Sequence, residues 1–286
     1  MEDTGQLILG AVAYDPKVVA IWDGFQKYFG ARDLDLDYIL FSNYEKQVEA
    51  HFRGLIHVAW NSPLAWLESE RLAKALGRRA EAIVMRDTDM DLTSIIVVRA
   101  DSGIRELADL KGKKVGVGAS DSPQAKLIPL NFLAEKGVGP DTDFTVILFD
   151  KLVGKHGDHI GGERDAARAL MNGDVDAACI LDGNRLGFTR EGTISSSATR
   201  VLAQTPPFDH CNFTVLGGSP SSLINRFRDL LLEMSYANDE VRPLFDLEGL
   251  KRWLPGRTKG YAQLTAAVDR FGTIDSFVKG VAAQCK

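Results

Sequence analysis

Short apolar runs typical of β-strands alternate with amphipathic runs of helical period along most of this chain. The alternation begins at residue 7 and continues to residue 181. It favours an α/β protein with mixed sheets flanked by helices, followed by a C-terminal third that is mostly helix. The predicted strands are Leu7–Val12, Leu36–Leu40, Val58–Trp60, Ala82–Met85, Ile95–Val98, Lys114–Gly118, Phe144–Phe149, Ala177–Leu181 and Asn212–Leu216. The predicted helices are Lys17–Phe29, Tyr44–Phe52, Leu127–Glu135, Arg164–Asn172, Ser221–Tyr236, Glu240–Leu244, Leu247–Leu254 and Tyr261–Phe271.

The length of 286 residues is enough for two lobes, each with its own core. Two segments have the character of crossings between lobes: Ser94–Val98, and Val201–Thr205 before two prolines. If both cross, residues 1–98 and 206–286 form lobe I and residues 99–205 form lobe II, joined by a two-strand hinge. Such a molecule can close over a ligand by bending at both strands.

Composition narrows the classes of function. The formal charge of −5 and the scattered basic residues argue against nucleic-acid binding, and no apolar run is long enough for a membrane span. The acidic residues after Met1 do not match a secretory signal, so we expect either a cytoplasmic protein or one whose leader has been removed. Three cysteines without CxxC spacing argue against disulfides and structural zinc, and only Cys211, beside His210, stands out.

Polar residues cluster where predicted strands lead into helices. In lobe II, the strand Lys114–Gly118 is followed by Ser120, Asp121 and Ser122, any of which can cap the helix that begins near Pro123. Unpaired N–H groups and the positive end of the helix dipole make such a start receptive to an anionic or oxygen-rich ligand.

Lobe I repeats this design. Asn61 and Ser62 follow a strand and open a helix, where they either bind ligand or only cap the helix. Tyr14 ends the first strand, at the edge where an open α/β sheet has its ligand crevice.

A glycine-rich loop at 154–163, GKHGDHIGGE, is the least ordinary segment. It is interpreted either as a loop that contacts ligand or as a solvated turn. A metal site formed by His156, Asp158, His159 and Glu163 is a further alternative, although nothing in the sequence fixes the loop in one coordination geometry.

Four segments carry a resemblance to a known family: SNYEKQVEAHFRG, HVAWNSPLAW, TSIIVVRADSGIRELADLKGKKVGVG and ARALMNGDVDAACILDG. In this order they resemble the PhnD-like substrate-binding proteins of phosphonate and phosphate-ester ABC transporters. The third segment is the most specific, and the similarity covers nearly the whole chain. The resemblance implies the two-lobe type 2 periplasmic binding-protein fold, with a ligand held between the lobes.

The family's ligand residues carry over only in part. Tyr44 falls on a tyrosine that faces the ligand, and the family's hydroxyl cluster falls on Ser122, Pro123 and Gln124, of which only the first has a hydroxyl. A second family tyrosine falls near Leu92 or Thr93 and is missing. The family's histidine falls at Glu163, and an acidic position is retained as Asp182. Two carboxylates suit an amine, so the ligand is expected to be phosphonate-like or zwitterionic, with a neutral or cationic ligand left open.

We therefore expect a solute-binding protein that captures a small polar ligand and delivers it to an ABC transporter permease. No catalytic motif is present, and no cofactor, nucleic acid or membrane span is expected. The chain is expected to be a monomer or dimer, and to be periplasmic if a leader was removed. The alternatives are a cytoplasmic enzyme on the same fold, resembling thiamin-pyrimidine synthases or menaquinone-pathway enzymes, and a ligand-sensing domain. The expected ligand-binding residues are Tyr14, Tyr44, Asn61, Ser62 and Ser94 from lobe I, and Ser120, Asp121, Ser122, Gln124, His159, Glu163 and Asp182 from lobe II.

Overall fold

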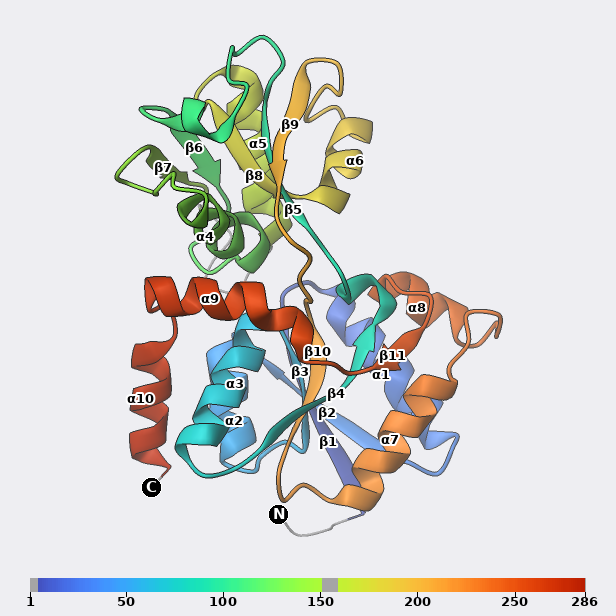
Figure 1. Ribbon diagram of the computed structural model, residues 1–286. Helices are drawn as coiled ribbons and strands as arrows, with labels where there is room; N and C mark the ends of the chain where they lie inside the picture. Colours follow the sequence, from blue (N-terminus) through green and yellow to red (C-terminus); the bar gives the residue numbers. More distant parts are fainter. Residues whose placement is uncertain (1–4, 151–158, 286) are drawn as a thin grey trace. The chain divides into compact units, whose positions relative to one another are not determined.

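A computed structural model describes residues 5–150 and 159–285, and in it the chain forms two compact units (Figure 1). The first unit comprises residues 1–90, 209–261 and 274–286, and the second comprises residues 91–208 and 262–273. The chain thus passes between the units at 90/91, 208/209, 261/262 and 273/274, whereas the sequence predicted two boundaries, at 98/99 and 205/206. Both predicted crossing strands pair within the second unit's sheet, which explains the difference.

The first unit is built on a six-stranded mixed sheet with the order β11-β4-β10-β3-β1-β2. Strands β1, β2, β3 and β4 run in one direction, and β10 and β11 run against them. The strands are β1 (Gln6–Val12), β2 (Asp35–Phe41), β3 (Val58–Asn61), β4 (Ala80–Arg86), β10 (Asn212–Leu216) and β11 (Trp253–Pro255). The helices are α1 (Lys17–Gly30), α2 (Tyr44–Phe52), α3 (Pro63–Ala75), α7 (Ser221–Glu233), α8 (Arg242–Glu248) and α10 (Asp275–Gln284), with short 3-10 turns η1 (Asp87–Asp89) and η4 (Lys259–Tyr261).

Apolar stripes on these helices cover both faces of the sheet. Helices α1, α7 and α8 pack one face through an aromatic core centred on Phe213, whose ring lies 4.6 Å from Trp60 and 5.1 Å from Phe227. Helices α2, α3 and α10 cover the other face, where Val48 and Leu72 are fully buried. The inner strands β1, β3, β4 and β10 are therefore mostly buried, whereas the edge strand β2 keeps Asp35 and Asp37 exposed.

The second unit has a five-stranded sheet with the order β7-β6-β8-β5-β9. Strands β6, β7 and β8 are parallel, and β5 runs antiparallel to both β8 and β9. The strands are β5 (Ser94–Arg99), β6 (Lys114–Val117), β7 (Thr145–Leu148), β8 (Ala177–Leu181) and β9 (Thr199–Gln204). The helices are α4 (Ile128–Glu135), α5 (His159–Asn172), α6 (Asp182–Arg190) and α9 (Ala262–Phe271), with a 3-10 turn η2 (Leu107–Leu110) and one π-helical turn η3 (Pro123–Leu127).

Three sequence expectations need correction here. The predicted helix Leu247–Leu254 is wrong, because Gly249 adopts φ +78° and ends α8, after which Trp253 pairs with Arg86 in the short strand β11. Ser94, expected in lobe I, lies in β5 of the second unit. Helix α9 belongs to the second unit because it packs on α4 and η3, and Arg270 donates a 2.7 Å hydrogen bond to Asn131.

Candidate functional site

Strands β1 to β4 of the first unit all end at one edge of its sheet, and helices α2 and α3 begin there. The side chains of Asn43 and Ser62 cap these helices by accepting hydrogen bonds from Lys46 N at 2.9 Å and Ala65 N at 3.3 Å. An open α/β sheet has its ligand crevice outside the carboxyl ends of its strands. This edge therefore carries the first unit's share of the candidate site.

Tyr14 and Tyr44 both lie at this edge. Tyr14 follows β1 and is 41% exposed, whereas Tyr44 begins α2 and is buried. Burial raises the pKa of Tyr44 well above its usual value, and Cys211 and Tyr14 add to that effect. Burial likewise raises the pKa of Tyr14. Both phenols therefore keep their protons and act as neutral hydrogen-bond donors or acceptors.

Asn61 and Ser62 lie at the end of β3, but their polar groups are already used inside the first unit. Asn61 is fully buried, and its Nδ2 donates to Thr214 Oγ1 at 2.9 Å and to Ser69 Oγ at 3.3 Å. Its Oδ1 accepts from Gln47 Nε2 at 2.8 Å. The observed geometry corresponds to the alternative in which Ser62 caps α3, while Asn61 fixes the strand end.

Arg86, at the end of β4, is a partly buried cation at the same edge that was not predicted from the sequence. Its guanidinium donates to Asp89 Oδ1 at 2.9 Å and to Glu248 Oε1 at 3.2 Å, and it lies 5.2 Å from the Trp60 ring centroid. Burial would lower the pKa of Arg86, but Asp89 and Glu248 raise it well above its usual value. Burial opposes ionisation of Asp89 too, yet Arg86 and His210 lower its pKa to about 2. This edge thus holds a fixed ion pair, and the strand-end rule applied to Tyr14 would have singled out Arg86.

The corresponding edge of the second unit is formed by the carboxyl ends of β6, β7 and β8. Ser122 is fully buried and caps η3, since its Oγ accepts from Ala125 N at 3.1 Å. Asp121 is buried, whereas Ser120 is exposed and its carbonyl accepts a 2.9 Å hydrogen bond from Lys126 Nζ. Lys126 was also missed from the sequence, and it puts a cation near the end of the five-residue helix η3.

Glu163 and Gln124 form a buried polar chain behind that edge. Glu163 Oε1 accepts from Gln124 Nε2 at 3.1 Å, and its Oε2 accepts from Leu181 N at 2.7 Å and from Asn184 Nδ2 at 3.0 Å. Ser94 Oγ donates to the Gln124 carbonyl at 2.5 Å. Glu163 therefore joins the starts of η3, α5 and α6, so its carboxylate supports this edge from inside.

The remaining expected residues lie around the same edge or outside the described part. Asp182 begins α6 and is exposed. His159 begins α5, but its side chain lies outside the described residues, as do His156 and Asp158. Residues 159–163 form the start of α5 and not a loop, and the Glu163 carboxylate is buried and accepts three hydrogen bonds. The parts of the loop and metal interpretations that rest on residues 154–158 lie outside the described residues and stay predictions.

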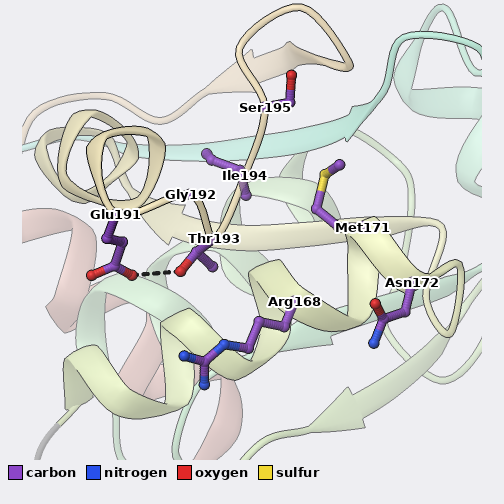
Figure 2. A pocket seen from close by; sticks show the side chains of 8 residues that line it. All are labelled: Arg168, Met171, Asn172, Glu191, Gly192, Thr193, Ile194 and Ser195. Atoms are coloured by element: carbon purple, nitrogen blue, oxygen red, sulfur yellow. Dashed lines mark hydrogen bonds between the residues drawn. The ribbon is translucent and has the colours of Figure 1, made fainter.

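A surface hollow of about 580 Å³ lies elsewhere on the second unit (Figure 2). It is bordered by the C-terminal turns of α5 and the segment that follows α6. The expected ligand residues do not line it, so it is separate from the candidate site. Its lining residues are Arg168, Met171, Asn172, Glu191, Gly192, Thr193, Ile194 and Ser195.

A family model described as "ABC transporter, phosphonate, periplasmic substrate-binding protein" matches residues 11–261. The chain belongs to this family. Its members are substrate-binding proteins of transport systems, and the comparisons give no support to the enzyme alternative. Within the described ranges 5–150 and 159–285, none of the helices is long and apolar enough to cross a membrane.

Solved structures share the fold at low sequence identity. PhnD1 from Prochlorococcus marinus in complex with methylphosphonate is 18% identical, with a TM-score of 0.68 over 94% of this chain and 99% of that one. A Xanthomonas citri protein bound to ATP is 15% identical, with a TM-score of 0.67 over 97% and 98%. A binding protein component of an ABC phosphonate transporter from Pseudomonas aeruginosa is 16% identical, with a TM-score of 0.60 over 99% and 90%. These likenesses confirm the type 2 periplasmic binding-protein fold.

Proposed function

We propose that this protein binds a small phosphonate-like or zwitterionic molecule and delivers it to an ABC transporter permease at the periplasmic side of a membrane. The family match supports the transport role, and the methylphosphonate complex of PhnD1 shows the kind of ligand that this fold accepts in that protein. The ligand of this chain is inferred from its own residues.

The start of η3 is the observation that carries the proposal. The capped start of η3, the exposed Ser120 that precedes it and the ammonium group of Lys126 near its end all favour an anionic oxygen. Burial lowers the pKa of Lys126, while Asp121 and other carboxylates oppose that change. The buried Asp121 and the exposed Asp182 add negative charge along the same edge, which favours a ligand that also carries an amine.

Two of the connections between the units lie beside the candidate residues. Strand β5 begins, and β9 ends, at the same edge of the second sheet as η3. Strand β4 ends, and β10 begins, at the edge of the first sheet that holds Tyr14 and Tyr44. These two connecting segments therefore enter each unit beside its candidate residues, where a bound ligand would contact them.

Isothermal titration of the full chain with methylphosphonate, aminoethylphosphonate, inorganic phosphate, ethanesulfonate and ethylamine tests this proposal. We expect the phosphonates to bind, with aminoethylphosphonate tightest, and ethylamine alone to bind weakly. Lys126→Met should weaken phosphonate binding at least about tenfold, because it removes a charge-assisted contact.

Lys136→Met is the matched control, since Lys136 is exposed at the other end of α4. A folded protein that binds none of these compounds would refute the proposed ligand class. Equal effects of the two lysine substitutions would refute the placement of the site at η3.

A further inference from the structure

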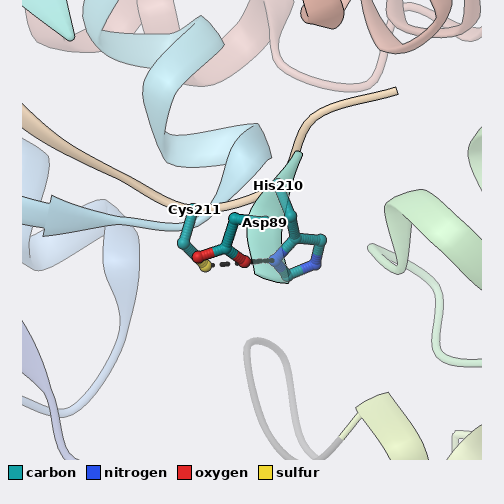
Figure 3. A group of neighbouring side chains, drawn as sticks. All are labelled: Asp89, His210 and Cys211. Atoms are coloured by element: carbon teal, nitrogen blue, oxygen red, sulfur yellow. Dashed lines mark hydrogen bonds and ion pairs between the residues drawn. The ribbon is translucent and has the colours of Figure 1, made fainter. Parts of the chain in front are cut away.

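Three side chains with different ligand atoms converge at the strand edge of the first unit (Figure 3). Asp89, His210 and Cys211 present an oxygen, a nitrogen and a sulfur that all lie within 4.8 Å of one another. His210 Nδ1 is 3.1 Å from Cys211 Sγ and 3.5 Å from Asp89 Oδ1. In the part of the chain that the structure describes, they form a compact group of potential metal ligands.

The backbone holds these residues in place from two distant segments. Asp89 ends η1, directly after β4, and His210 and Cys211 directly precede β10. His210 N donates to the Asp89 carbonyl at 2.8 Å, and the carbonyl of His210 accepts from Tyr261 Oη at 2.7 Å. The arrangement is therefore set by the folded chain and needs little rearrangement to accept an ion.

Two of the three ligand separations can be compared with tetrahedral zinc coordination. With Zn–S of about 2.3 Å and Zn–N and Zn–O of about 2.0 Å, a tetrahedral site separates sulfur and nitrogen by about 3.5 Å and nitrogen and oxygen by about 3.3 Å. The observed nitrogen–oxygen separation of 3.5 Å fits, and the sulfur–nitrogen separation of 3.1 Å has to widen by about 0.4 Å. Arg86 donates to the Asp89 carboxylate and orients it, as outer partners of metal ligands commonly do.

We propose that Asp89, His210 and Cys211 bind a zinc ion, with the fourth coordination position left for water or another ligand. A sulfur and an imidazole nitrogen favour Zn²⁺ over Mg²⁺ and Ca²⁺, which prefer oxygen ligands. His210 retains 21% exposure of its side chain, which gives the ion a route to the two more deeply buried ligands. A cysteine binds zinc as the thiolate, so binding releases the Cys211 thiol proton to solvent as the Zn–S bond forms.

Titration of the metal-free full chain with Zn²⁺, and with Co²⁺ as a spectroscopic probe, tests this site. We expect one zinc ion per chain, release of a proton, and a sulfur-to-cobalt charge-transfer band in the ultraviolet. Cys211→Ser should abolish the band and weaken zinc binding at least about tenfold, and His210→Gln should weaken it similarly. Cys285→Ser, a partly exposed cysteine near the C-terminus, is the matched control and should change neither.

Two further outcomes would overturn the proposal. One is a folded wild-type protein that binds no zinc. The other is zinc binding that survives Cys211→Ser but is lost in the His156→Gln/His159→Gln double variant, which would place the ion on the glycine-rich loop. Circular dichroism of each variant shows whether it is folded. Because the readout is metal binding, failure here leaves the proposed phosphonate function untouched.

Discussion

Replacing the buried carboxylate of Glu163 gives the sharpest test of how the second unit is held together. The carboxylate accepts three hydrogen bonds, from Gln124 Nε2, Leu181 N and Asn184 Nδ2, at 3.1, 2.7 and 3.0 Å. Glu163→Ala leaves these donors without that acceptor, and a buried donor without a partner costs about 1–3 kcal/mol. Together with the gap left by the side chain, we expect the free energy of unfolding to fall by at least about 3 kcal/mol.

Glu163→Gln should lower the free energy of unfolding by a smaller amount, about 1–2 kcal/mol. The amide oxygen can replace Oε2 and keep the bonds from Leu181 and Asn184. The amide nitrogen then faces Gln124, whose Oε1 is buried without a hydrogen-bond partner among the described residues. If Gln124 turns its amide, it can accept from the new nitrogen. Only the assistance of the negative charge is then lost.

Urea unfolding followed by far-UV circular dichroism measures both effects. Tryptophan fluorescence is unsuitable, because Trp22, Trp60, Trp66 and Trp253 all lie in the first unit. Asp165→Asn is the matched control on the same helix, since its exposed pair with Arg168 should contribute no more than about 0.5 kcal/mol. If Glu163→Ala has the same free energy of unfolding as Asp165→Asn, the Glu163 carboxylate does not hold the helix starts together.

Three other substitutions follow from the geometry, each measured by urea unfolding. Gly162→Ala should lower the free energy of unfolding by about 1–3 kcal/mol, because a Cβ there would lie 2.6 Å from the carbonyl oxygen of Phe149. An unchanged urea midpoint would contradict this close approach. Arg257→Met should lower the free energy of unfolding by about 3 kcal/mol, because the buried Asp209 carboxylate loses hydrogen bonds of 2.6 and 2.7 Å from the guanidinium. A decrease below about 1 kcal/mol would contradict the pairing. Burial lowers the pKa of His51 from 6.5 to about 3. The contribution of the neutral His51 to the free energy of unfolding should therefore be fully present above pH 6.5 and fall by about 1.4 kcal/mol per pH unit as the pH drops toward 3. His51→Leu should flatten that slope between pH 6 and 4, and an unchanged slope would contradict the assignment.

Local patterns were sufficient to predict most of the elements. Buried strands such as β8 and amphipathic helices such as α1 carry enough apolar residues for their period to be read directly. The three-residue strand β11 has no period of its own, and it forms because Trp253 packs between Phe213 and Phe245 in the core. Helix α6 was missed because its first turn, Asp182-Gly183-Asn184, has the composition of a turn. Tertiary packing decides both cases.

The strand-end rule predicts where a site lies but not which side chains remain available to a ligand. Asn61 and Glu163 fall at the predicted edges, yet each is saturated by partners far away in sequence, such as Thr214 for Asn61 and Asn184 for Glu163. Local sequence patterns do not reveal those distant hydrogen-bond partners, so every polar residue at a strand end is predicted as a candidate. The same limitation hid Asp89, which completes the ligand group of His210 and Cys211 only because β4 and β10 pair. Pairing between distant strands decides which polar side chains are already used, and it separates the buried residues that build each edge from residues such as Tyr14 and Ser120, which stay exposed there.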